Sequence, residues 1–109
     1  MTSANRRAAN RQPVTIPGFL ALAYNTEACV IRNLSLGGAL VARTATSRIA
    51  LGTEGRLSFS LSTLGEPIVA DLTIRWWEDR AVGVQFGALR AKEVWALGTY
   101  LELLKPAAR

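Results

Sequence analysis

Residues 56–86 read RLSFSLSTLGEPIVADLTIRWWEDRAVGVQF, and apolar side chains alternate with polar ones through three runs of this stretch. Leu57, Phe59 and Leu61 open the pattern, and residues 68–77 and 82–86 repeat it. Alternation with a period of two is typical of a strand that buries one face. Polar turn segments separate the runs, so the stretch predicts three consecutive antiparallel strands.

Weaker patterns on both sides of this stretch extend the prediction. Upstream, β-branched and aromatic residues between turn signals predict three more strands, at residues 14–24 (broken or bulged at Pro17-Gly18), 28–32 and 39–43. Residues 44–55 form a polar connection. Downstream, the apolar residues follow helical spacing and Pro106 stops the helix; they are Val94, Leu97, Leu101 and Leu104.

Six short antiparallel strands followed by one helix indicate a mostly β fold, either a small barrel or a sandwich. The helix is expected to cover one open end or flank. Strand alternation assigns Trp76 to the core and Trp77 to the opposite face. Trp95 and Tyr100 are expected to pack the helix against the strands.

Length and composition narrow the classes of function. The chain has 109 residues, 50% of them hydrophobic, which fits one domain with a core of its own. No stretch approaches the roughly 18 apolar residues of a membrane span. Arginines interrupt the N-terminus, where a signal peptide would need an apolar segment. We therefore expect a soluble cytoplasmic protein without membrane insertion.

The sequence contains no histidine and one cysteine, Cys29. A Ser-His-Asp triad, a Cys-His pair and an imidazole metal site are thereby excluded. Cys29 lies in an apolar run and is interpreted as a small buried hydrophobe. The nearest approach to an acidic cluster, Asp71, Glu78 and Asp79, falls on positions expected to be solvated. We expect neither an enzyme nor a metal or cofactor site.

The net charge of +5 comes largely from the N-terminal segment. Residues 1–11 hold three arginines and no acid, whereas the rest of the chain nearly balances, with ten basic against eight acidic residues. A duplex-binding protein usually shows a wider basic footprint, so DNA or RNA is not the expected partner. Residues 1–12 are interpreted as a flexible basic arm ahead of the folded part.

Two short motifs carry candidate binding chemistry. In the arm, Arg7 and Arg11 are four residues apart, with Arg6 directly before them, and guanidinium forks bind phosphates and the Hoogsteen edge of guanine. Residues 33–38 read NLSLGG, in which Asn33 and Ser35 can cap a turn. Taken singly, the first motif is better explained by a solvated arm. The second, taken singly, is better explained by an ordinary turn between strands with Asn and Ser capping.

Taken together, the order and spacing of these motifs resemble the PilZ family. The resemblance covers the arm, the six strands, the final strand around Gly83 and the closing helix. PilZ domains are bacterial cytoplasmic receptors for cyclic di-GMP, and they are built on a six-stranded β-barrel. The resemblance therefore implies a six-stranded antiparallel β-barrel with a C-terminal helix. It implies an arm at residues 1–12 that carries the RxxxR motif, and a barrel with helix at residues 13–109.

The resemblance also implies residue roles. Arg7 and Arg11 would hold the phosphates and the Hoogsteen edges of the guanines. The turn would surround a guanine through Asn33, Ser35, Gly37 and Gly38. The family has Asp or Asn at the first position of this turn, and Asn33 lacks the carboxylate charge, which could weaken binding. Arg6 resembles the form of the family that takes a stacked dimer of the ligand.

The sequence leaves three functions open. The first is a cyclic di-GMP receptor that orders its arginine arm over the ligand and signals in trans to an unidentified effector protein. The second is a PilZ-fold module for protein interaction that does not bind the nucleotide. The third is a small barrel for single-stranded nucleic acid, against which the few outward aromatic and basic residues of the strands argue.

Overall fold

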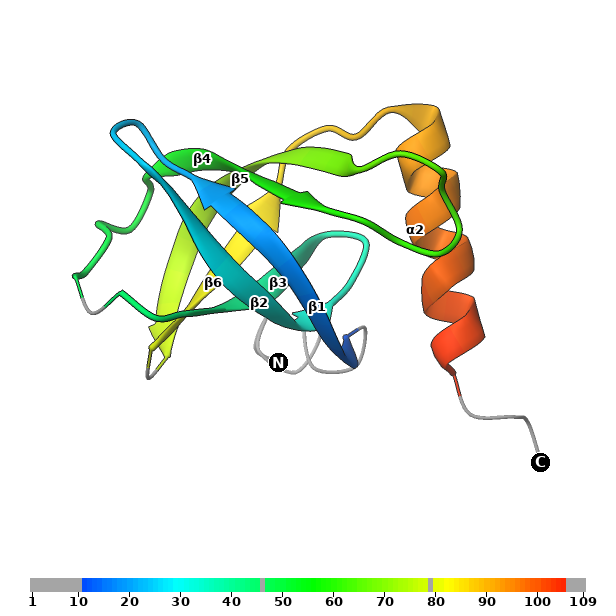
Figure 1. Ribbon diagram of the computed structural model, residues 1–109, viewed down its shortest axis with the longest axis horizontal. Helices are drawn as coiled ribbons and strands as arrows, with labels where there is room; N and C mark the ends of the chain where they lie inside the picture. The colour runs from blue at the N-terminus through cyan, green and yellow to red at the C-terminus, as the bar shows by residue number, and fades with distance from the viewer. Residues whose placement is uncertain (1–10, 46, 79, 106–109) are drawn as a thin grey trace, which may run out of the picture.

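The computed structural model describes residues 11–45, 47–78 and 80–105. These residues form six strands and one helix (Figure 1). In chain order the elements are β1 (Gln12–Ala21), β2 (Thr26–Leu34), β3 (Gly38–Arg43), β4 (Glu54–Phe59), β5 (Ile68–Glu78), β6 (Ala81–Phe86) and α2 (Ala91–Leu104).

The strands close into a barrel in the order β1-β2-β3-β6-β5-β4, and every neighbouring pair is antiparallel. Of the two sheet architectures left open by the strand pattern, the barrel is therefore the one that forms. Figure 1 shows α2 standing at one side of the barrel beside the loop between β4 and β5. The Thr63 hydroxyl of that loop donates to the Ala96 carbonyl of α2 across 2.7 Å.

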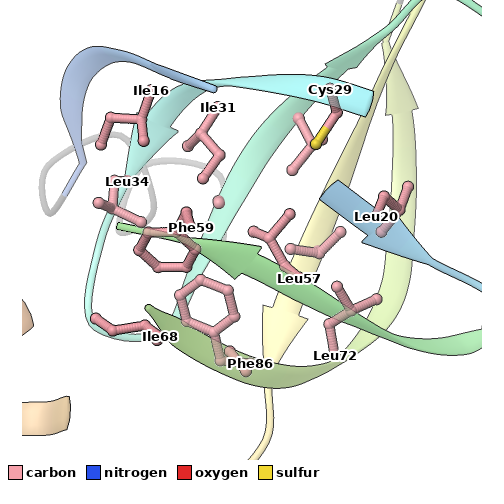
Figure 2. Packing of buried hydrophobic residues seen from close by; sticks show 14 of the residues in the cluster. Ile16, Leu20, Cys29, Ile31, Leu34, Leu57, Phe59, Ile68, Leu72 and Phe86 are labelled. Atoms are coloured by element: carbon pink, nitrogen blue, oxygen red, sulfur yellow. The ribbon is translucent and has the colours of Figure 1, made fainter. Parts of the chain in front are cut away.

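One apolar cluster fills the barrel interior, and every strand and the helix contribute to it. Figure 2 shows part of this cluster, with side chains from the strands. The rings of Phe59 and Phe86 stack within it, with centroids 6.5 Å apart. Cys29 lies in the same cluster, as its apolar neighbours predict, and burial raises its pKa to about 11. The largest fully buried side chains are Leu20, Ile31, Leu34, Leu57, Ile68, Ile74, Leu97, Val41 and Val84.

Several predicted boundaries were wrong because local turns override the residue pattern. The first strand ends at Ala21 rather than at Tyr24, since the Leu22 amide donates to the Asn25 carbonyl and closes a turn there. No break occurs at Pro17-Gly18, and the bulge of β1 lies instead between Pro13 and Ile16.

The remaining corrections concern the polar connection and the helix. Glu54 and Gly55, predicted to lie in the connection, pair with β5 and begin β4. Trp95 is 63% exposed, so its predicted packing role is wrong, whereas Tyr100 does pack against the core. Within the described part of the chain, no helix has the length and apolar character to cross a membrane.

A buried ion pair ties the start of β2 to the end of β3. The Arg43 guanidinium donates to both carboxylate oxygens of Glu27, at 2.5 and 3.1 Å, and to the carbonyl oxygen of Ser47 at 2.6 Å. The two charged side chains are only 6% and 14% exposed. Hydrogen bonding from Arg43 is the largest cause that lowers the pKa of Glu27 below its ordinary value.

We predict that Glu27→Gln lowers the free energy of unfolding by about 2 kcal/mol, because it leaves a buried guanidinium without its counter-charge. A carboxylate with a lowered pKa stabilises the fold above its ordinary pKa, and this stabilisation is lost as the carboxylate is protonated. The parent should therefore lose more stability than the variant as the pH falls below about 4.5.

Urea unfolding at pH 7 and at lower pH measures both effects. Glu102→Gln is the matched control because it breaks the exposed pair of Glu102 with Lys105, and it should cost less than about 0.5 kcal/mol. If both variants lost the same free energy of unfolding, the buried pair of Glu27 and Arg43 would not stabilise the fold more than an exposed pair does.

Candidate functional site

The turn between β2 and β3 is built around the hydroxyl group of Ser35. Its oxygen accepts hydrogen bonds from the amides of Gly37 and Gly38, at 3.2 and 3.1 Å, and the hydroxyl donates to the Gly38 carbonyl at 3.2 Å. The Ser35 amide donates to the same carbonyl at 2.9 Å. The hydroxyl therefore shapes the turn, which is the capping role its sequence position allows.

Gly38 lets the turn lie directly against β6. A Cβ atom at this position would stand 2.2 Å from the carbonyl oxygen of Val84, which is too close for any side chain. The Gly37 carbonyl accepts from the Phe86 amide at 2.8 Å, so both glycines fix the turn to the same strand. Gly37 itself is exposed, and a Cβ there would meet nothing within 4 Å.

A row of register partners crosses the barrel beside this turn. Asn33 pairs with Pro13 of β1 on one side and with Leu40 of β3 on the other. Leu40 pairs with Gly83 of β6, and Gly83 pairs with Trp76 of β5. Antiparallel register partners share one face of a sheet, so the whole row lies on one face of the barrel wall. Leu40 is buried but absent from the interior cluster, which identifies this face as the outer one.

The position of Trp76 corrects the prediction that it belongs to the core. A bulge between Ile74 and Trp76 shifts the register by one residue, so the side chain that alternation would point inward points outward. The indole lies flat against Gly83, where a Cβ would stand 1.9 Å from its ring. Gly83, a glycine within a strand, was the sequence signal for a close approach at this place.

Arg11 joins the arm to this outer row. Gln12 pairs with Leu34, so Arg11 and Ser35 flank the same register pair, and the end of the arginine motif lies next to the turn. The Arg11 guanidinium carbon stands 4.7 Å from the centre of the Trp76 ring. Such a cation–π contact contributes about 0.5–2 kcal/mol, depending on its exposure to water. Arg6 and Arg7, the other predicted arm residues, lie outside the described residues.

The structure therefore brings together five of the seven predicted site residues, along one side of the barrel, and adds Trp76 to them. They are Arg11, Asn33, Ser35, Gly37 and Gly38. This surface offers a guanidinium fork, an amide and an indole face, a set suited to a planar, anionic, nitrogen-rich ligand. Among the described residues no group of acidic, cysteine or histidine side chains could hold a metal ion.

The family model of the PilZ domain matches residues 5–103, which is nearly the whole chain. No curated relative matches it. Among solved structures, the PilZ domain of CeSA from a cellulose-synthesizing bacterium superposes with a TM-score of 0.68 at 21% identity, over 85% of this chain and 96% of that one.

Two further structures are larger than this chain, which spans about half of each. The Bacillus subtilis inhibitor of motility, MotI/DgrA, has a TM-score of 0.76 at 18% identity, over 86% of this chain and 48% of its own. PlzA of Borreliella burgdorferi, solved in complex with c-di-GMP, has a TM-score of 0.66 at 15% identity, over 91% and 45% respectively. At these identities the likeness shows the fold.

We predict that Gly38→Ala lowers the free energy of unfolding by about 2 kcal/mol, because the added methyl group must displace the backbone of β6. Gly37→Ala is the matched control in the same turn, and its stability should be unchanged or slightly raised, since nothing obstructs its methyl group. Thermal unfolding followed by circular dichroism measures both variants. A Gly38→Ala protein as stable as Gly37→Ala would contradict the close approach of the turn to β6.

Proposed function

The chain belongs to the PilZ domain family, a family of cyclic di-GMP receptors, and we propose that it binds cyclic di-GMP on the outer row that ends at Trp76. The observation that carries this proposal is the meeting of its two motifs. The pairing of Gln12 with Leu34 puts the last arginine of the arm beside the turn of Ser35 and Gly38. Two distant motifs thus converge on one surface.

The ligand is a dianion with two guanine rings. Different residues of the site contact its phosphates and its guanines. Arg7 and Arg11 take the phosphates and the Hoogsteen edges of the guanines by paired, charge-assisted hydrogen bonds. The Asn33 amide oxygen accepts from guanine N–H groups, with less strength than a carboxylate would give. Ser35 keeps its hydroxyl within the turn and contributes shape. Arg6 extends the arm toward a second, stacked ligand.

Trp76 adds a platform to this scheme. Its ring lies flat on Gly83 and is contacted by the Arg11 guanidinium on the outer surface. A guanine can lie on the same ring, because base–aromatic stacking contributes about 1–3 kcal/mol. Ligand entry then moves Arg11 from the indole to the ligand. The free energy of the lost cation–π contact is regained in hydrogen bonds to an anion.

The affinity follows from the number of contacts. Binding at micromolar strength needs about 8 kcal/mol. Each hydrogen bond between charged groups supplies roughly 1.5–3 kcal/mol, and ordering the arm costs part of that sum. One arginine would not suffice, whereas two or three arginines together with the turn and the indole would.

The domain has the role of a receptor without catalytic activity, in the cytoplasm, and its output is a change of surface. Closing the arm over the ligand creates a new face that an effector protein can recognise. In this proposal the chain consists of an arm at residues 1–12 and a barrel with helix at residues 13–109. The alternative is a PilZ-fold interaction module that does not bind the nucleotide.

Isothermal titration of cyclic di-GMP into the purified protein tests the proposal, with GMP and cyclic di-AMP as ligand controls. We expect low-micromolar or tighter binding that Arg7→Ala/Arg11→Ala abolishes. The control, Arg56→Ala/Lys105→Ala, also removes two positive charges, but from exposed ion pairs. It should bind cyclic di-GMP with the affinity of the parent. No binding up to about 100 µM would contradict the receptor and leave the interaction module.

We predict that Trp76→Leu weakens cyclic di-GMP binding by roughly fivefold to thirtyfold, because leucine keeps an apolar cover over Gly83 but offers no ring for stacking. Trp95→Leu, on the exposed side of α2, is the control and should bind with unchanged affinity. The same titration measures both variants. Parent-like affinity in Trp76→Leu would remove the indole from the site.

A further inference from the structure

A cavity lies at the opposite end of β3 from the Ser35 turn. It has a volume of about 250 Å³ and opens between the segment after β3 and the turn that joins β5 to β6. Figure 1 shows both segments on the side of the barrel away from α2. The described residues that line it are Arg43, Ala45, Ser47, Arg48, Trp77, Glu78, Arg80, Ala81 and Val82.

Trp77 and Arg48 form a fixed wall of this cavity. The Trp77 indole N–H donates to the Ile49 carbonyl at 2.6 Å, which holds the ring in place. The Arg48 guanidinium carbon lies 4.2 Å from the centre of that ring. A stacked guanidinium keeps its N–H edges for in-plane hydrogen bonds, and stacking reduces the entropy that it loses when it binds a carboxylate.

Arg80 occupies a backbone conformation that rarely suits its side chain. Its φ of 58° lies in the left-handed region, which turns between strands normally fill with glycine, asparagine or aspartate. Its carbonyl accepts from the Arg43 amide at 2.8 Å, so the turn is fastened to β3. An arginine at a strained turn position, with its side chain at a cavity, points to a binding role.

The charges and the size of the cavity indicate what it accepts. Glu27 already neutralises Arg43, so among the described lining residues Arg48 and Arg80 face one acid, Glu78. Asp79, the next residue of the chain, lies outside the described residues. The volume is below the roughly 300–1,000 Å³ of pockets for whole small molecules. It suits one side chain, and tryptophan and arginine are enriched where protein interfaces bind most strongly.

We propose that this cavity is a docking site for an acidic segment of a partner protein, which places one carboxylate between Arg48 and Arg80 and rests its apolar stem on Trp77. The site is complete in the chain without the nucleotide. It is separate from the outer row, because Trp76 and Trp77 are consecutive residues of β5 and their side chains point to opposite faces of the strand. The domain would thus bind a nucleotide on its outer wall and a protein at the end of the barrel.

The indole N–H of Trp77 provides a local probe in ¹⁵N-correlated NMR spectra of the full chain. Titration with a hexaglutamate peptide should shift this signal saturably and leave the Trp95 signal in place. A hexaglutamine peptide should shift neither signal. Inorganic phosphate should produce at most a small shift, since it lacks the apolar stem. A phosphate shift as large as that of the peptide would overturn the assignment to a protein partner.

Two variants separate binding from structure. Arg80→Asn suits the left-handed turn, so it should keep or raise the melting temperature while weakening peptide binding at least fivefold. Arg48→Ala should weaken binding by a similar factor. Arg56→Ala is the control for charge and should bind the peptide as the parent does. An equal loss in Arg56→Ala, or no loss in Arg80→Asn, would overturn the proposal.

Titration with cyclic di-GMP shows whether the docking cavity and the nucleotide site are independent of each other. Arg48→Ala and Arg80→Asn should bind cyclic di-GMP as the parent does, because neither residue lies on the outer row. A variant that lost nucleotide and peptide binding together would overturn the separation of the two sites. Peptide binding by a chain that does not bind cyclic di-GMP would support the docking site and contradict only the receptor.

Discussion

The contact of the Trp76 indole with the backbone of Gly83 organises the outer wall of this barrel. It requires a residue without a Cβ on β6 and a bulge in β5 that turns the tryptophan outward. The indole then lies at the end of a row that begins beside the arm, and Arg11 reaches it. Without the bulge, the side chain of Trp76 would point into the barrel, and Arg11 would lose its contact with the indole.

The fold was predictable where local pattern and burial agree. The alternation of Leu57 and Phe59, and of Ile68 through Ile74, matches strands whose inner face is buried. The β-rich sequence left barrel and sandwich open, because closure depends on the pairing of β1 with β4, which no local pattern encodes. The predicted Pro17-Gly18 break failed because the strand accommodates both residues, and its bulge falls nearer the arm.

The site was predictable to the extent that it consists of motif residues close in sequence. Ser35 to Gly38 form the turn, and their mutual hydrogen bonds follow from their order. Asn33, predicted to cap this turn, instead belongs to the end of β2 and pairs with Leu40. Trp76 was missed, because a bulge inverts the alternation that assigned it to the core. The strain at Arg80 was also hidden, since its backbone conformation is set by the closed hairpin between β5 and β6. Both residues acquire their roles from pairing between strands.

The most direct test of the account is a set of intermolecular nuclear Overhauser effects between bound cyclic di-GMP and the isotope-labelled protein. The account predicts contacts from a guanine H8 to the ring protons of Trp76, and from the ligand to the Gly38 amide proton. Ligand contacts confined to α2 or to the cavity beside Trp77, with none to Trp76, would contradict it.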